Sequence, residues 1–71
     1  MIKVQSMRNT DSDLNTYKVL LFSDTKDEVE STPLEDIMGL PENANIEFGS
    51  IIYTANLDVA LMASDGNWVW N

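Results

Sequence analysis

The sequence contains no cysteine and no histidine. Disulfide bonds, thiolate zinc sites and imidazole metal sites are therefore excluded, and we expect no metal and no cofactor. A domain of 71 residues is near the lower limit for folding alone, because it buries only about 60% of the surface that its unfolded chain exposes. Such small domains usually need a covalent link, a metal or a partner subunit. With the first two excluded, oligomerisation is the support that we expect.

Basic residues are also scarce. Four Lys and Arg stand against twelve Asp and Glu, which gives a formal charge of −8. Such a surface repels nucleic-acid phosphate, so we do not expect a nucleic-acid partner. The negative charge instead favours solubility or docking on a basic protein. No apolar run approaches the ~20 residues that cross a bilayer, and the residues after Met1 lack the apolar stretch of a signal peptide. We expect a soluble protein, not secreted by that route, without a membrane partner.

The last third of the chain organises the rest. Residues 50–55, 58–63 and 68–70 are rich in β-favouring residues, and turn signals at 56–58 and 64–67 join them. Asp65-Gly66 between apolar runs is a strong hairpin signal, which favours a type I′ turn because Gly tolerates positive φ. The pattern predicts a three-stranded antiparallel meander, which residues 46–48 open, so that the meander region is 46–71.

The rest of the chain is expected to be simpler. Residues 2–7 alternate between apolar and polar side chains, and residues 17–22 are rich in β-branched and aromatic residues that favour a strand. Region 1–22 is therefore predicted to be a hairpin or an arm around a polar loop at 8–15. Region 23–45 is predicted to be a linker with a helical turn. Thr25 and Glu28 have the spacing of a helix start, and a turn from Pro33 to Gly39 would bury one apolar face. The members of that face would be Leu34, Ile37 and Met38. The predicted fold is therefore one mainly β domain, a small antiparallel β-meander with an amino-terminal hairpin or arm and a short helical turn.

The second meander strand is apolar on both faces, whereas a strand with one solvated face should alternate. Trp68 and Trp70 share a face of the third strand, with Val69 on the other. Something is expected to cover both sides. Another subunit is the favoured cover, in a homo-oligomer that is preferably a trimer or a hexameric ring, and the chain's own arm and helical turn are the alternative. The expected core and interface residues are Tyr53, Val59, Leu61, Met62, Trp68 and Trp70.

Two possible reactive sites fail on their residues. The spacing of acids and amides over 9–15 resembles a calcium loop, but a loop that starts at Asp11 needs Gly at its sixth position and Glu at its twelfth. Thr16 and Phe22 stand there. The carboxylates between Asp24 and Asp36 lack a nucleophile, a histidine and a glycine-rich phosphate loop. The protein is therefore predicted not to be an enzyme.

Two binding functions remain open as alternatives. Tyr53, Trp68 and Trp70 could form an aromatic platform for a sugar ring, although aromatic side chains on a small sheet are more often core or subunit interface. The acidic surface could instead imitate nucleic-acid phosphate, so that the protein would be a small inhibitor that blocks a basic groove on a host target.

The segment from Gly49 to Trp68 has Gly49-Ser50 before a strand that ends in Tyr53-Thr54-Ala55-Asn56, a second strand over 58–62, and the finish Asp65-Gly66-Asn67-Trp68. With these features it resembles the closing segment of small structural proteins of tailed bacteriophages, of the head-fibre or capsid-decoration type. The resemblance covers about a third of the chain and brings no active-site residues. It implies a non-enzymatic virion protein, made in the host cytoplasm, whose partners are copies of itself and other virion proteins.

Overall fold

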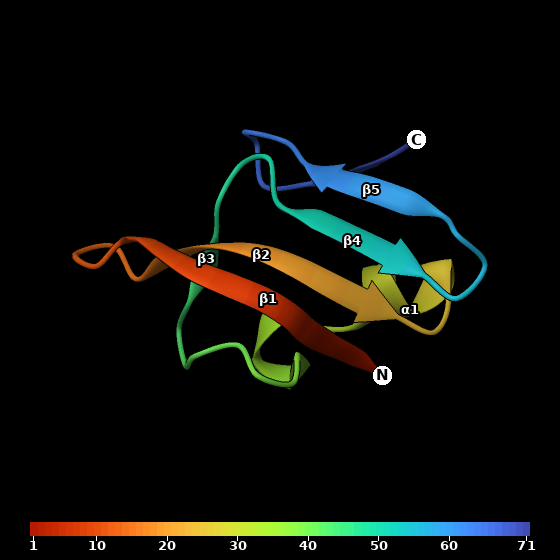
Figure 1. Ribbon diagram of the computed structural model, residues 1–71, viewed down its shortest axis with the longest axis horizontal. Coiled ribbons are helices and arrows are strands. Elements are labelled where there is room, and N and C mark those ends of the chain that lie inside the picture. The colour runs from red at the N-terminus through yellow and green to blue at the C-terminus, as the bar shows by residue number, and fades with distance from the viewer.

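Six strands form one mixed sheet in the computed structural model, which describes residues 1–71. The elements are β1 (Ile2–Asp11), β2 (Thr16–Ser23), α1 (Lys26–Ser31), the 3₁₀ turn η1 (Leu34–Asp36), β3 (Asn45–Ile46), β4 (Ile51–Thr54), β5 (Val59–Met62) and β6 (Trp68–Trp70). The strand order is β1-β2-β4-β5-β6, and β3 pairs with the start of β2 (Figure 1). The predicted mainly β fold is confirmed.

The carboxyl-terminal meander has the predicted order. Strands β4, β5 and β6 pair antiparallel, with Ile52 opposite Ala60 and Ala60 opposite Trp70. The type I′ prediction for the second turn is wrong, because only Gly66 there has positive φ, at 88°. Its N–H donates to the Ala63 carbonyl, so the left-handed glycine is the last residue of a four-residue turn that begins at Ala63, a common longer hairpin loop.

The amino-terminal hairpin is confirmed and is longer than predicted. Arg8 to Asp11 were expected in a loop, but they belong to β1 and pair with β2, for example Arg8 with Lys18. The Asn9 amide and the Thr10 hydroxyl both donate to the Thr16 carbonyl. These cross-strand bonds explain why residues with a turn preference continue the strand.

The connection from β2 to β4 makes the sheet mixed, because these two strands are parallel. It contains α1, which begins after the predicted cap, since the Thr25 hydroxyl accepts the Glu28 N–H at 3.2 Å. The same connection contains β3, in which Ile46 lies opposite Tyr17 of β2. Residues 45–46 therefore pair with the same edge of β2 that β4 occupies further along, and they do not pair with the meander strand β5.

The hydrophobic core lies on one face of the sheet, between the strands and the connection that carries α1 and η1. Its buried members are Ile2, Val19, Leu21, Val29, Ile37, Ile52 and Ala60.

The predicted buried face at 34–38 is wrong. Of its members only Ile37 is buried, while Leu34 and Met38 are 45% and 53% exposed. The reason is local. The 3₁₀ turn ends at Asp36, and Met38 then pairs with the edge of β1, donating to the Ile2 carbonyl and accepting from the Val4 N–H. In such extended backbone successive side chains point to opposite sides.

Candidate interaction surface

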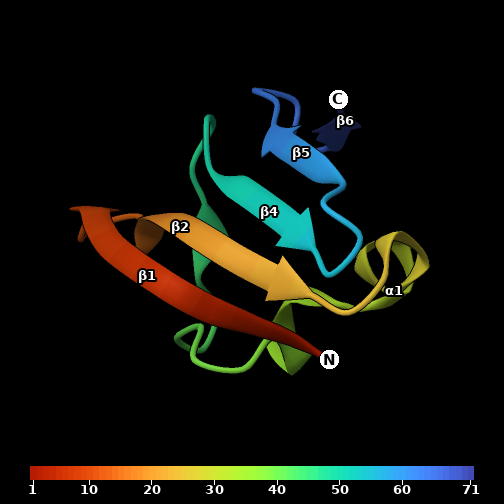
Figure 2. The same cartoon turned by 45° about the vertical axis from the view of Figure 1, so that its right-hand side comes forward.

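The second face of the sheet has no layer of its own. Cross-strand partners share a face, so the register places seven apolar residues together there in two rows. In Figure 1, α1 lies behind the ends of β2 and β4, and the 3₁₀ turn lies mostly beyond the edge of β1. The turned view of Figure 2 shows α1 beside the ends of these two strands. We call this surface the uncovered face. Its apolar members are Leu20, Ile51, Leu61 and Val69 in one row and Phe22, Tyr53 and Val59 in the other.

Exposure on this face rises towards the edge of the meander. Ile51, Leu61 and Val69 are 39%, 47% and 57% exposed. Soluble domains commonly expose single apolar side chains, but a contiguous apolar patch marks a contact surface. The row therefore has the composition of a surface that another molecule covers.

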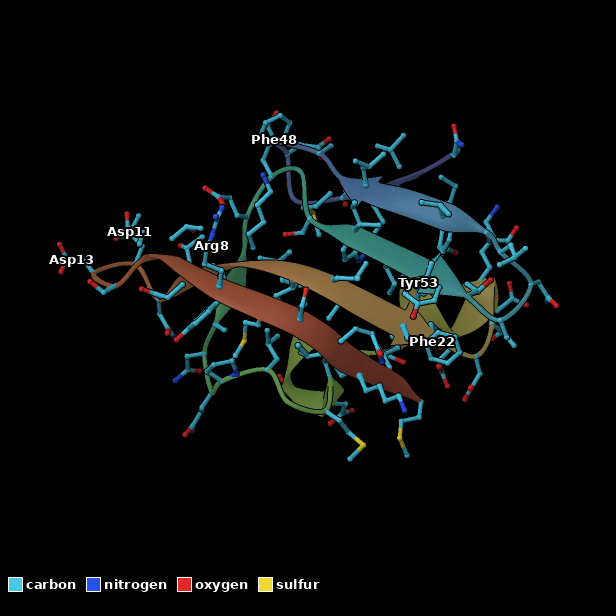
Figure 3. The ribbon with its side chains drawn as sticks, viewed as in Figure 1. Arg8, Asp11, Asp13, Phe22, Phe48 and Tyr53 are labelled. Atoms are coloured by element: carbon cyan, nitrogen blue, oxygen red, sulfur yellow. The ribbon has the colours of Figure 1, made fainter.

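Two aromatic rings meet in the other row. The Phe22 and Tyr53 ring centroids lie 5.3 Å apart with an interplanar angle of 65°, an edge-to-face contact (Figure 3). Both rings are half-buried. Such pairs prefer this geometry because the positive ring edge meets the negative ring face. The contact thus fixes the two rings relative to one another on neighbouring strands.

A hollow of about 380 Å³ opens at the other end of the uncovered face. Arg8 and Lys18 line it together with Ser6 and Gly49. Gly49 has a φ of 88°, and a Cβ there would lie 3.2 Å from the Lys18 Nζ, so a side chain would crowd the lysine. In Figure 3, Arg8 and the exposed Phe48 lie at the opposite end from Phe22 and Tyr53.

The six residues expected from the sequence divide between the two faces. Tyr53, Val59 and Leu61 belong to the uncovered face. Met62 is buried on the other side, and Trp68 and Trp70 are half-buried beside it. Tyr53 therefore lies on the opposite face from both tryptophans, and the three rings do not form one aromatic platform.

Four residues of the uncovered face were missed, namely Leu20, Phe22, Ile51 and Val69. A signal for two of them was present. The segment 17–22 is apolar on both faces, as the segment 59–63 is, and only the second was read as two-sided. That β2 and β4 are neighbours could not be read from the sequence, because the long connection between them hides their parallel pairing.

The chain's amino-terminal end is attached to the start of α1. The Met1 amino group contacts carboxylate oxygens of Asp24, at 2.8 Å, and of Glu28. Hydrogen bonds to Asp24 and then Glu28 raise the pKa of this amino group above its ordinary value. The same contact, followed by a hydrogen bond from the Ser23 hydroxyl at 2.8 Å, lowers the pKa of Glu28. These are the only ion pairs in the structure, so no Lys or Arg side chain pairs with a carboxylate.

Two further features concern metals and membranes. The acidic side chains form no group of three or more placed to hold a metal ion. The longest helix, α1, has six residues, and no helix reaches the length and apolar character of a membrane span.

Comparisons with known proteins identify no relative. No protein-family model matches the chain, and neither the curated proteins nor the solved structures contain a significant match.

Proposed function

We propose that this chain is a non-enzymatic structural protein of a tailed-bacteriophage particle, a head-decoration or head-fibre component that binds copies of itself and other particle proteins. The observation that carries the proposal is the uncovered face, where the apolar rows lie on a rigid sheet without a layer of their own. An assembly protein needs such a surface, since burial of apolar area drives most protein association.

The particle as the site of action rests on the resemblance of the segment from Gly49 to Trp68. That segment forms strands β4 and β5 and begins β6. Four of its residues, Ile51, Tyr53, Val59 and Leu61, lie on the uncovered face, so the segment that resembles particle proteins also supplies much of the proposed contact surface. The preferred assembly is a trimer or a hexameric ring, because particle proteins commonly sit on symmetry axes.

Mass spectrometry of purified phage particles tests this proposal. The protein should be present at a fixed copy number relative to the major particle proteins and should withstand washing. Its absence from particles that are made by cells expressing the gene would overturn the proposed function.

An acidic inhibitor is the second candidate, and one observation favours it. Six of the twelve carboxylates lie between Asp24 and Asp36, on the side of the sheet opposite the uncovered face. An inhibitor of this kind would be absent from particles and would bind a basic groove with an affinity that falls steeply as salt rises. The sugar-binding alternative loses its platform, since Tyr53 and the two tryptophans lie on opposite faces.

A further inference from the structure

The charges of this protein are divided between the two sides of its sheet. Lys3 lies opposite Phe22, and Arg8 lies opposite Lys18, which is two positions from Leu20. All three cations therefore share the uncovered face with the apolar rows. One carboxylate holds a paired strand position on that face, Asp11 opposite Thr16 at the far end of β1, and its oxygen accepts the N–H groups of Asp13 and Leu14. Three of the four basic side chains of the chain are gathered on this face, although the chain as a whole is strongly acidic.

These cations are unpaired within the chain. The two ion pairs of the structure both involve the Met1 amino group, so neither Arg8 nor Lys18 has a carboxylate within ion-pair distance. The two side chains instead lie across from one another beside the hollow. Like charges directly opposite in a sheet are unfavourable. A carboxylate from another molecule would relieve this repulsion.

The opposite side of the molecule offers such carboxylates beside apolar groups. We call the segment from Asp24 to Asp36, which covers the core, the acidic layer. At its end Glu35 and Asp36 are exposed, and neither side chain makes a hydrogen bond or an ion pair. The exposed Leu34 precedes them.

We propose that the uncovered face of one copy binds the acidic layer of the next copy. Arg8 and Lys18 would meet Glu35 and Asp36, while Leu34 would pack on the apolar rows. A face-to-face pair would instead bring two sets of three cations together and leave them without partners. The charge pattern therefore favours the arrangement in which two different surfaces meet.

The size of the surface is sufficient. The longer dimensions of the molecule are 35 and 21 Å, and the view down its shortest axis shows the strands broadside (Figure 1). A face of these dimensions is of the order of the ~800 Å² per partner that stable interfaces bury. An interface between two different surfaces closes into a ring when its rotation permits and otherwise continues as a filament. The inference rests on the self-association in the proposed function, and it names the two different surfaces that meet when copies associate.

Charge reversal in two variants tests this arrangement. The face variant carries Arg8→Glu with Lys18→Glu, and the layer variant carries Glu35→Lys with Asp36→Lys. For each variant alone, the association constant should fall by about tenfold or more, because like charges would meet across the contact. An equimolar mixture should recover assembly, since the reversed face fits the reversed layer and the two unchanged surfaces fit each other. Molar mass from light scattering is the readout, with circular dichroism as the check on folding.

A control with the same change of net charge separates local from global effects. Asp13→Lys with Glu42→Lys matches the layer variant in charge and alters two exposed side chains outside both surfaces. It should assemble at least as well as the parent, since it only reduces the overall repulsion.

Two results would overturn the inference. The first is a parent chain that stays monomeric. The second is a layer variant that assembles like the parent, which face-to-face packing predicts because its uncovered face is unchanged. The proposed function fails separately, through absence of the protein from particles, and complementation of the two variants would stand without it. Presence in particles together with either of the first two results would leave the function and remove the inference.

Discussion

Arg8 and Lys18 lie directly opposite one another on β1 and β2, and no carboxylate of the chain pairs with either. In a chain with twelve Asp and Glu, this arrangement disfavours the isolated fold. Natural proteins retain unfavourable local features mainly where function requires them. Removal of one of these two charges should therefore raise the stability of the monomer and weaken the binding of another copy.

Lys18→Gln should stabilise the monomer by roughly 0.2–0.5 kcal/mol, because it removes a like-charge cross-strand pair at an exposed position. Urea unfolding at low protein concentration and low salt measures the change. Lys3→Gln is the matched control, since Lys3 lies opposite Phe22 and has no cationic partner across the strand. An equal gain in both variants would show that general charge, and not this pair, sets the effect.

Ile51 and Ile52 provide a comparison of the two faces within one strand. Ile52 is fully buried, so Ile52→Ala should cost about 2–5 kcal/mol. That loss is comparable with the whole stability of a domain of this size, roughly 4–10 kcal/mol. Chemical denaturation or the loss of the folded circular dichroism signal would show it.

Ile51→Ala is the internal control, because it removes the same atoms from the uncovered face. It should leave the monomer folded and weaken self-association. A loss of folding as large as that of Ile52→Ala would contradict the assignment of Ile51 to an exposed contact surface.

The sequence was sufficient for the local elements of this fold. Alternating and β-branched residues located the hairpin and the meander, and Thr25 with Glu28 located the start of α1. Each of these signals acts over a few residues. The seven-residue uncovered face was only partly predicted, because it depends on β2 and β4 lying side by side across a connection of more than twenty residues.

The errors have similar causes. Leu34 and Met38 were assigned to a buried helical face, but hydrogen bonds between Met38 and β1 hold that segment extended. Tyr53 was grouped with Trp68 and Trp70 by residue type, whereas the period of two in strands separates them. Tertiary hydrogen bonds and strand register decided these positions, and neither is visible in a short stretch of sequence.

The two turns of the meander should respond oppositely to glycine. Leu57 has a φ of 67° and is 82% exposed, so it occupies the left-handed region without burying its side chain. Leu57→Gly should therefore stabilise the domain by about 0.5–1 kcal/mol. Thermal or urea unfolding measures the gain.

Gly66→Ala is the counterpart in the second turn. An added Cβ at Gly66 meets nothing within 4 Å, so only the φ of 88° opposes it, and the loss should be about 1 kcal/mol. If Leu57→Gly destabilised the chain instead, Leu57 would have a packing role that its exposure does not show.

Stability should depend on pH through the contact of Glu28 with the Met1 amino group. The pKa of Glu28 is lowered from 4.5, so its contribution is present above pH 4.5 and is lost as pH falls through the lower folded pKa. The pKa of the amino group is raised from 8.0, so its contribution is present below pH 8.0 and is lost as pH rises through the higher folded pKa. The Tm should be highest between these limits.

Glu28→Gln should lower the Tm near neutral pH and flatten its dependence on pH at both ends. Glu30→Gln is the matched control on the same helix, because Glu30 is exposed and contacts neither Met1 nor Ser23. Identical pH profiles for the two variants would contradict the role assigned to Glu28.

The uncovered face should bring copies of this chain together. Light scattering coupled to size exclusion, over micromolar to millimolar concentrations, measures this association. The molar mass should rise with concentration to a multiple of the 8.0 kDa chain. A mass that stays at 8.0 kDa over the whole range would contradict this prediction.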